Sequence, residues 1–400
     1  MTSTERTILW VYAAIVAIWP IRHLVLWYAF KRIDILNTKS PQFSQPDPPL
    51  VTVMIPAKDE EGAIGDCLAS ICAQTYRNLE ILVVDDRSTD RTGEIGQTFA
   101  EADSRVRVLT ITDLPEGWTG KTHALQVAAD QARGDWFWFL DCDTRHAPEN
   151  LAIVMEYARI QRADLASLLL ELRCETFWES LVQPLAGIVL MQSFPLFRVN
   201  NDRDPLAFAN GQYILVRREA YEAAGGHHAV RDRFVEDIYL ADRVKALGRP
   251  IRVAIARGIG STRMYASLGQ IVRGWSRILY DALGRSSVRL LGRLLDPVIF
   301  SQTGHVVFLA VLILLAMGRQ DSFVLGLGAL TLIHHALNYS VLKRVYRMSV
   351  PDSRSMGWYP VANLVIEWIL IRSIRMCLTG QVTWRGTSYG TNVKTQSTTG

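Results

Sequence analysis

Cysteine and runs of like charge are both scarce in this sequence. Its five cysteines are odd in number and include no CxxC pair, which argues against a disulfide framework and against a zinc site. We therefore expect reduced thiols that face the cytosol. The 43 basic and 39 acidic residues are scattered along the chain and leave a net charge of +4. This scatter argues against nucleic acid as a partner.

Apolar residues, in contrast, are abundant. They make up 49% of the 400 residues, and the mean hydropathy of +0.11 indicates that part of the chain lies in lipid. The stretch from Ile8 to Phe30 is long enough to cross a hydrocarbon core of ~30 Å, and Lys31 and Arg32 follow it directly. A cleaved signal peptide would have a shorter apolar region and a small-residue cleavage site. We therefore predict an uncleaved anchor, with the next domain in the cytosol by the positive-inside rule.

Residues 50–266 have the pattern of an α/β domain with a largely parallel sheet, because short β-branched runs alternate with helical stretches. Three of the predicted strands run directly into polar clusters. In open α/β sheets, ligands bind outside the carboxyl ends of the strands, so these clusters predict one shared site. The clusters are Pro56 to Glu61, Asp85 to Asp90 and Asp141 to Asp143.

Two further apolar segments, Pro297 to Met317 and Phe323 to Leu342, predict a transmembrane hairpin. A last segment, Trp358 to Leu378, carries a glutamate and two arginines, so it is either a third C-terminal span or a helix in the membrane interface. An amphipathic stretch before the hairpin also suits the interface. The predicted boundaries are 1–32 for the anchor, 33–49 for a Pro-rich linker, 50–266 for the catalytic domain, 267–293 for the interface region, 294–380 for the transmembrane region and 381–400 for a polar tail.

The Asp141-Cys142-Asp143 tripeptide suits a divalent cation that bridges a diphosphate, because hard cations prefer carboxylate oxygens and leave positions free for phosphate. Asp143 is the first choice for the direct ligand. The alternative is an acidic turn in a solvated loop, which the two neighbouring polar clusters make less attractive. At the second strand end, Asp86 offers a carboxylate that can accept a base N–H or a ribose hydroxyl.

Two later motifs complete the set of candidate residues. Asp237, at the start of a predicted helix, can deprotonate an acceptor hydroxyl, although an acidic first helical turn is equally expected from the helix macrodipole. Farther on, Arg273 can hold a pyrophosphate, and Trp275 can stack on a sugar or an acceptor. Basic and aromatic residues together are also ordinary interface anchors.

Taken in order, these motifs resemble those of glycosyltransferase family 2. The resemblance covers about residues 50 to 282, more than half of the chain, and the order of the motifs makes it specific. It implies a GT-A fold, a nucleotide-diphospho-sugar transferase domain, here with one N-terminal and two to three C-terminal transmembrane helices. The motifs are Ile55 to Glu61, Val84 to Asp90, Asp141 to Asp143, Glu236-Asp237 and Gln270 to Trp275.

The resemblance also assigns roles to residues. It implies that Asp143, helped by Asp141, holds Mg²⁺ or Mn²⁺, that Asp237 is the base, and that the reaction inverts the anomeric carbon. The segment that ends in Lys121 resembles one that encloses the nucleotide, which makes Lys121 a phosphate or base contact. The nucleoside pocket would be lined by Pro56, Ala57, Glu60 and Asp86.

One departure from the family pattern narrows the expected activity. Gly274 stands between Arg273 and Trp275, whereas long-chain polymer synthases usually keep Arg and Trp adjacent. The chain is more similar to enzymes that glycosylate membrane lipids such as carotenoid acids, hopanoid-associated lipids, diacylglycerol or ceramide. We therefore expect a multi-pass enzyme of the inner membrane that transfers a hexose from a UDP-sugar to a membrane lipid, with no protein partner implied. The alternatives are a polyprenyl-phosphate glycosyltransferase or polysaccharide synthase and, in another class, a non-catalytic scaffold that binds nucleotide-sugar.

Overall fold

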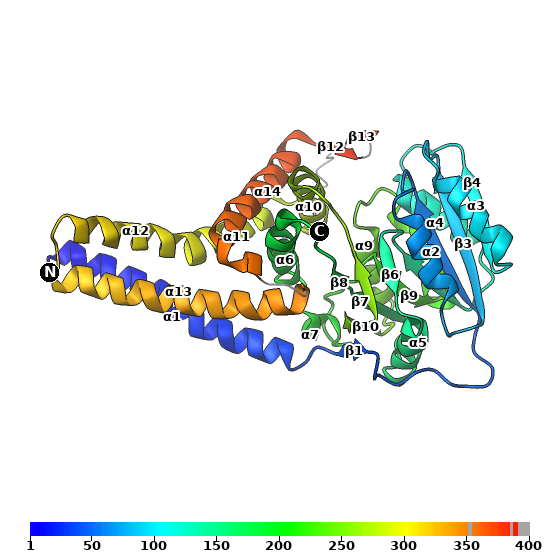
Figure 1. The fold of residues 1–400 in the computed structure, drawn as a ribbon, viewed down its shortest axis with the longest axis horizontal. Helices are drawn as coiled ribbons and strands as arrows, with labels where there is room; N and C mark the ends of the chain where they lie inside the picture. Colours follow the sequence, from blue (N-terminus) through cyan, green and yellow to red (C-terminus); the bar gives the residue numbers. More distant parts are fainter. Residues whose placement is uncertain (351–353, 385–386, 391–400) are drawn as a thin grey trace, which may run out of the picture. The chain divides into compact units, whose positions relative to one another are not determined.

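The computed structural model describes residues 1–350, 354–384 and 387–390, and the chain divides into two compact units (Figure 1). The sheet unit comprises residues 31–173 and 194–264. The helical unit comprises residues 1–30, 174–193 and the chain from 265 onward. Residues 385–386 and 391–400 of the predicted polar tail lie outside the described residues.

The sheet unit is built on an eight-stranded sheet in which every strand is parallel to its neighbours except β9. Apolar runs such as Trp136–Leu140 are buried along their whole length, as expected of strands covered on both faces. In spatial order the strands are β1 (Ile35–Asn37), β10 (Ile251–Arg257), β7 (Leu165–Leu169), β9 (Tyr213–Arg217), β5 (Trp136–Leu140), β2 (Val51–Ala57), β3 (Leu79–Asp86) and β4 (Val106–Ile111).

A smaller sheet has three strands, and each of them follows a strand of the large sheet along the chain: β6 follows β5, β8 follows β7 and β11 follows β10. It pairs β11 (Gly260–Thr262) with β6 (Thr144–His146) and with β8 (Glu171–Leu172), so the residues after Asp143 are held by a ladder. The helices of the sheet unit are α2 (Ile64–Cys72), α3 (Thr92–Ala102), α4 (Gly120–Gln131), α5 (Asn150–Ile160), α7 (Leu196–Val199), α8 (Arg218–Ala223), η1 (His227–Val230) and α9 (Glu236–Ala246).

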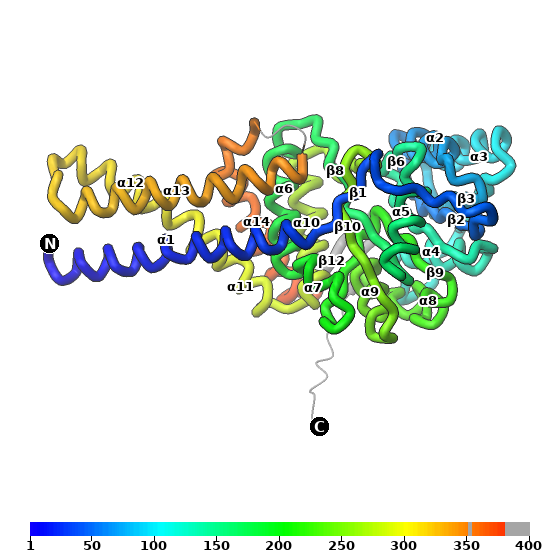
Figure 2. Tube along the Cα trace, turned by 90° about the horizontal axis from the view of Figure 1, so that it is seen from below, coloured from blue at the N-terminus to red at the C-terminus, as the bar shows by residue number. Residues whose placement is uncertain are grey.

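The helical unit contains the apolar helices that the sequence predicts. Figure 2 shows α1, α12 and α13 running side by side, and Tyr12, Val311 and Leu327 belong to the apolar cluster between them. Its helices are α1 (Ser3–Phe30), α6 (Phe177–Met191), α10 (Leu268–Ala282), α11 (Ser287–Pro297), the π-helix η2 (Val298–Gln302), α12 (Thr303–Ala316), α13 (Ser322–Ser349), η3 (Arg354–Trp358) and α14 (Tyr359–Thr379). Strands β12 (Gln381–Trp384) and β13 (Thr387–Gly390) form a short hairpin.

Four stretches of the described chain are long and apolar enough to cross a membrane: 3–30, 177–199, 287–316 and 322–349. The first, third and fourth correspond to the predicted anchor and hairpin. Residues 358–378, for which the sequence left two possibilities, lie in α14 except for the first of them, and α14 is not among the four.

The second stretch was not expected from the sequence. Residues 174–193 fall inside the range 50–266, yet α6 packs with α10 and α14 in the helical unit. A capping box between Thr176 and Glu179 starts the helix, and Glu179 is its one charged residue, so the remainder is apolar enough for a membrane. The range 33–49 likewise contains more than a linker, because β1 pairs with β10.

Gly134 provides a test of how tightly the sheet is packed. A Cβ at this position would lie 2.6 Å from the backbone N of Thr52 and 2.8 Å from the carbonyl oxygen of Leu50. We expect Gly134→Ala to lower the free energy of unfolding by about 1–3 kcal/mol, because backbone atoms have to move. Gly62→Ala, with no atom within 4 Å of the added Cβ, is the control. Thermal unfolding in detergent measures both, and equal midpoints for the two variants would contradict this view of the packing.

Candidate functional site

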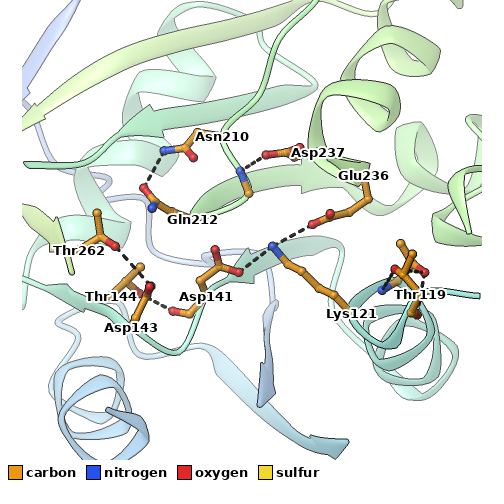
Figure 3. Close-up of polar contacts among 12 residues, drawn as sticks. Thr119, Lys121, Asp141, Asp143, Thr144, Asn210, Gln212, Glu236, Asp237 and Thr262 are labelled. Atoms are coloured by element: carbon orange, nitrogen blue, oxygen red, sulfur yellow. Dashed lines mark hydrogen bonds and ion pairs between the residues drawn. The ribbon is translucent and has the colours of Figure 1, made fainter. Parts of the chain in front are cut away.

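The three predicted polar clusters meet at one edge of the sheet. Strands β2, β3 and β5 are parallel neighbours, with Pro56 opposite Val84 and Met54 opposite Phe139, so their carboxyl ends point the same way. Asp141 and Asp143 follow β5 directly, at the position that Figure 3 shows. This edge is the candidate site.

The antiparallel strand β9 also contributes to the site. Because it runs in the opposite direction, the residues just before β9, and not those after it, lie at this edge of the sheet. Tyr213 pairs with Leu140, so the start of β9 lies beside the end of β5. Asn210 donates to the carbonyl oxygen of Leu168 at 2.9 Å and to Oε1 of Gln212 at 3.1 Å. The backbone N–H of Gly211 donates to Oδ2 of Asp237 at 2.6 Å. A fourth loop is therefore fastened to the site.

Lys121 joins the two halves of the site. Its Nζ lies 2.7 Å from Oδ1 of Asp141 and 2.8 Å from Oε1 of Glu236, as Figure 3 shows. Burial alone would lower the pKa of Lys121, but the neighbouring carboxylates outweigh burial and raise this pKa well above its usual value. The ammonium therefore stays charged and links the Asp141 turn to the start of α9.

Two carboxyl groups of the site hold their protons more tightly than usual. Burial, together with the charges of Asp141 and Glu60, raises the pKa of Asp143 to about 8. Thr262 donates a hydrogen bond to Oδ1 of Asp143 at 3.3 Å, which opposes this shift in part. Burial and the adjacent Glu236 raise the pKa of Asp237 to about 7. Negative charge is thus concentrated here beyond what Lys121 offsets.

The ends of β2 and β3 are cross-linked by their own loops. Oδ1 of Asp59 accepts from the N–H of Thr89 at 2.7 Å, and Oδ2 of Asp90 accepts from the N–H of Glu61 at 3.0 Å. Pro56 and Ala57 are the last residues of β2, and the N–H of Glu60 donates to Thr92 at 2.8 Å. These bonds place the predicted nucleoside-pocket residues in a fixed frame.

Asp86 is buried at the end of β3 and faces the start of α4. Both of its carboxylate oxygens accept from Arg87, at 2.7 and 3.0 Å. A Cβ on Gly120 would lie 2.5 Å from Oδ2 of Asp86, so a glycine is needed where the helix approaches the carboxylate. Thr119 caps the helix by accepting from the N–H of Thr122. The segment before Lys121 is therefore packed onto the predicted nucleotide contact.

The carboxylate oxygens of the site are chemically suited to bind a divalent cation. Asp141 and Asp143 supply hard carboxylate oxygens, and the raised pKa of Asp143 reflects negative charge that a cation would offset. Among the described residues, no three carboxylate, imidazole or thiolate groups converge on one point. A metal held here would therefore take its remaining ligands from phosphate and water.

The other two predicted site residues lie on α10 in the helical unit. Arg273 is exposed, whereas Trp275 is 5% exposed and has little free ring surface for stacking on a sugar. The inserted Gly274 has a local explanation, because a Cβ there would overlap the ring of Tyr265. The insertion makes room for a tyrosine packed against the helix.

Several residues at the site were not singled out from the sequence. Asn210, Gly211 and Gln212 form a polar cluster before a strand, and such a cluster indicates this edge only when the strand is known to be antiparallel. Glu236 was noted only as the neighbour of Asp237, although it forms half of the Lys121 bridge. Thr262 comes from β11, a strand of three residues that is too short to show a hydrophobic periodicity in the sequence.

Comparison with known proteins identifies the kind of domain. Residues 52–225 match the model of Glycosyl transferase family 2. The 4,4'-diaponeurosporenoate glycosyltransferase of Staphylococcus aureus (strain N315) is 24% identical over 365 residues, which cover 90% of this chain and 92% of that relative. The protein of the same name from Staphylococcus haemolyticus (strain JCSC1435) is 29% identical over 246 residues, which cover 60% of this chain and 63% of that relative.

A solved structure with a similar fold is the mannosyltransferase PcManGT from Pyrobaculum calidifontis, in complex with GDP-Man and Mn²⁺. The alignment covers 94% of this chain and 99% of that one, with a TM-score of 0.54 and 18% sequence identity. At this identity the likeness shows the fold alone. It confirms the predicted GT-A fold with apolar helices at both ends of the chain.

The raised pKa of Asp143 predicts a pH-dependent effect on stability. Its pKa rises from 3.8 to about 8 on folding, so deprotonation opposes folding and the stability of the metal-free protein falls as the pH rises from about 4 to about 8. Asp143→Asn should raise the unfolding midpoint at pH 8, by about 2–4 °C for each kcal/mol gained, and change it little at pH 4. Thermal unfolding in detergent with a chelator measures this.

Asp90→Asn is the matched control for that experiment. The hydrogen bonds to Asp90 lower its pKa although desolvation opposes them, so its charged form supports folding above its usual pKa. This variant should lose stability at pH 8, the opposite sign to Asp143→Asn. The same decline with pH in Asp143→Asn and the wild type would show that Asp143 is not the group responsible.

Proposed function

We propose that this chain is a membrane-type glycosyltransferase of family 2 that transfers one hexose from a UDP-sugar to a membrane lipid, with inversion at the anomeric carbon; the match of residues 52–225 to the family model supports this. The observation that supports this most is the carboxylate of Asp237. Its pKa is raised to about 7, near the value that suits a general base at neutral pH. The N–H of Gly211 holds one carboxylate oxygen in place, which fixes the orientation of the base.

On this proposal Asp237 takes the proton of an acceptor hydroxyl while the hydroxyl oxygen bonds to the anomeric carbon. The bond between that carbon and the diphosphate breaks, and UDP leaves. A single displacement by an oxygen on the face opposite the diphosphate inverts the anomeric carbon. Asp86 accepts from the base or the ribose of the donor, within a pocket lined by Pro56, Ala57 and Glu60. Lys121 holds the Asp141 turn against the start of α9, so the groups on the donor side and the acceptor side keep a fixed separation.

The proposal includes Mg²⁺ or Mn²⁺ held by Asp143 with Asp141. When bound, the cation would offset the negative charge that develops on the leaving diphosphate. The concentration of carboxylates at the edge of the sheet supports this assignment. The presence of Mn²⁺ in the mannosyltransferase of similar fold agrees with it. Arg273 stays a proposed contact of the pyrophosphate, whereas the burial of Trp275 does not support the stacking role predicted from the sequence.

The lipid acceptor is supported by the apolar helices and by the relatives. Four stretches are long and apolar enough to cross a membrane, and the relatives are named for transfer to 4,4'-diaponeurosporenoate. Lys31 and Arg32 directly follow the first stretch, which supports a cytosolic sheet unit in a multi-pass protein of the inner membrane. The donor is then met in the cytosol and the acceptor in the bilayer.

The direct test is Asp237→Asn in the full-length protein, assayed for UDP release with UDP-sugars and a lipid extract. Loss of the base should reduce turnover by about 10²–10⁴-fold, while UDP binding in the presence of Mn²⁺, measured by calorimetry, stays unchanged. Asp232→Asn removes an exposed carboxylate five residues earlier and serves as the control.

The products decide between the alternatives. Mass spectrometry should show single-hexose adducts of a lipid, whereas a ladder of products would indicate a polysaccharide synthase. Wild-type turnover in Asp237→Asn would remove Asp237 from the mechanism. Binding of UDP without turnover on any lipid extract would favour the scaffold.

A further inference from the structure

The ammonium of Lys121 has one N–H more than its two ion pairs use. An ammonium carries three N–H donors. Oδ1 of Asp141 and Oε1 of Glu236 lie 2.7 and 2.8 Å from Nζ, and the ammonium forms no other ion pair or hydrogen bond with the described residues. The side chain of Lys121 is 20% exposed, so a ligand has access to it. The protein thus fixes the ammonium through two of its N–H groups and leaves the third for a ligand.

The same ammonium lies close to the proposed base. A Cβ on Gly211 would lie 3.0 Å from Nζ of Lys121 and 3.0 Å from Oδ2 of Asp237. Both groups therefore border the backbone of Gly211, and a glycine adds no side chain to the space beside them. Figure 3 shows Lys121 reaching from α4 to Glu236 at the start of α9. The third N–H of Lys121 is thus near the place where the acceptor would lose its proton.

The order of the strands gives the direction of a donor along this edge of the sheet. Strands β3, β2, β5 and β9 are consecutive neighbours. Asp86 ends β3, Asp141 follows β5 directly, and Gly211 precedes β9. A donor with its base at Asp86 and its diphosphate beside Asp141 has its sugar on the side of β9, toward Asp237. Two strand spacings, about 10 Å, separate the base from the strand end that Lys121 contacts, which disfavours a contact between Lys121 and the base.

We propose that Lys121 donates a hydrogen bond to a hydroxyl group of the hexose that is transferred, and so helps to select the sugar of the donor. The inference rests on the proposed function and deepens it, because it assigns a contact to the transferred group. A sugar hydroxyl accepts from the ammonium and can donate in turn to a neighbouring carboxylate. Hydrogen bonds from a charged donor are roughly twice as strong as those between neutral groups.

The test measures binding of UDP, UDP-glucose and UDP-galactose to the full-length protein in detergent, by calorimetry at saturating Mn²⁺. The readout is the Kd of UDP divided by the Kd of the UDP-hexose that binds more tightly. Lys121→Met keeps a side chain of similar length without an N–H, and should lower this ratio about tenfold or more, the equivalent of one hydrogen bond to a charged group. An effect of the lost charge on the diphosphate acts on both ligands and cancels in the ratio.

Lys39→Met is the matched control. It removes the same charge from an exposed position of the sheet unit and should keep the wild-type ratio. Two further variants examine how the ammonium is held. Glu236→Ala removes one of the two groups that fix Lys121 and should lower the ratio in part. Glu236→Gln keeps an oxygen for the ammonium and should restore the ratio toward the wild-type value.

Deoxy sugars identify the hydroxyl group. Among the 2-, 3-, 4- and 6-deoxy forms of the same UDP-hexose, one should bind to the wild type about tenfold more weakly than the parent compound. The same analogue should bind to Lys121→Met as tightly as the parent does, because the donor to that hydroxyl is gone. If Lys121→Met fails to fold, Lys121→Arg takes its place. This variant keeps the charge but moves the N–H groups, so it should lower the ratio and reduce the loss for that analogue.

An unchanged ratio in the Lys121 variant would overturn the proposal, since a contact with the diphosphate or the base contributes equally to both ligands. Equal affinities of the wild type for UDP and for both UDP-hexoses would overturn it too. Binding needs no acceptor, so a lowered ratio in a protein that transfers no sugar would leave the contact standing and remove the proposed function. Sugar transfer to lipid with an unchanged ratio would do the reverse.

Discussion

The position of Lys121 between carboxylates is the constraint on which the sheet unit depends. Its ammonium lies within 2.8 Å of both Asp141 and Glu236, groups that stand 95 residues apart in the chain. Without a cation there, the four carboxylates of the site would repel one another in a partly buried setting. One lysine therefore sets the distance between the strand end proposed to hold a metal and the helix start proposed to supply the base.

The topology of the sheet explains why these groups can meet at all. Parallel strands bring their carboxyl ends to one edge, and the antiparallel β9 brings its amino end to the same edge. The loop before β9 thus contributes Gly211, whose N–H orients Asp237. Before it reaches β9, the chain leaves the sheet unit at residue 173, forms α6 in the helical unit and returns at residue 194. The two units are therefore linked within the catalytic range as well as at its ends.

The helical unit contains polar side chains that join its helices. Those around His334 and Ser301 are buried and fully bonded, and they fasten α1, α13 and α14 to the π-helix η2. Nearby, Nδ1 of His335 and the hydroxyl of Tyr359 form a further bond at 3.1 Å, between α13 and α14. In lipid, where water cannot satisfy a polar group, such contacts pair the polar groups and hold the helices together.

The sequence by itself determined the α/β class, the apolar helices at both ends and the three polar strand ends, because periodicity and apolar length are local properties of the chain. It also identified Asp141, Asp143, Lys121 and Asp237 as candidates. Their mutual geometry was decided by the tertiary structure: the Lys121 bridge, the bond from Gly211 and the close approach at Gly120 join residues distant in sequence. The place of α6 in the helical unit was decided in the same way, because an apolar run has the same sequence pattern in a soluble core as in a membrane helix.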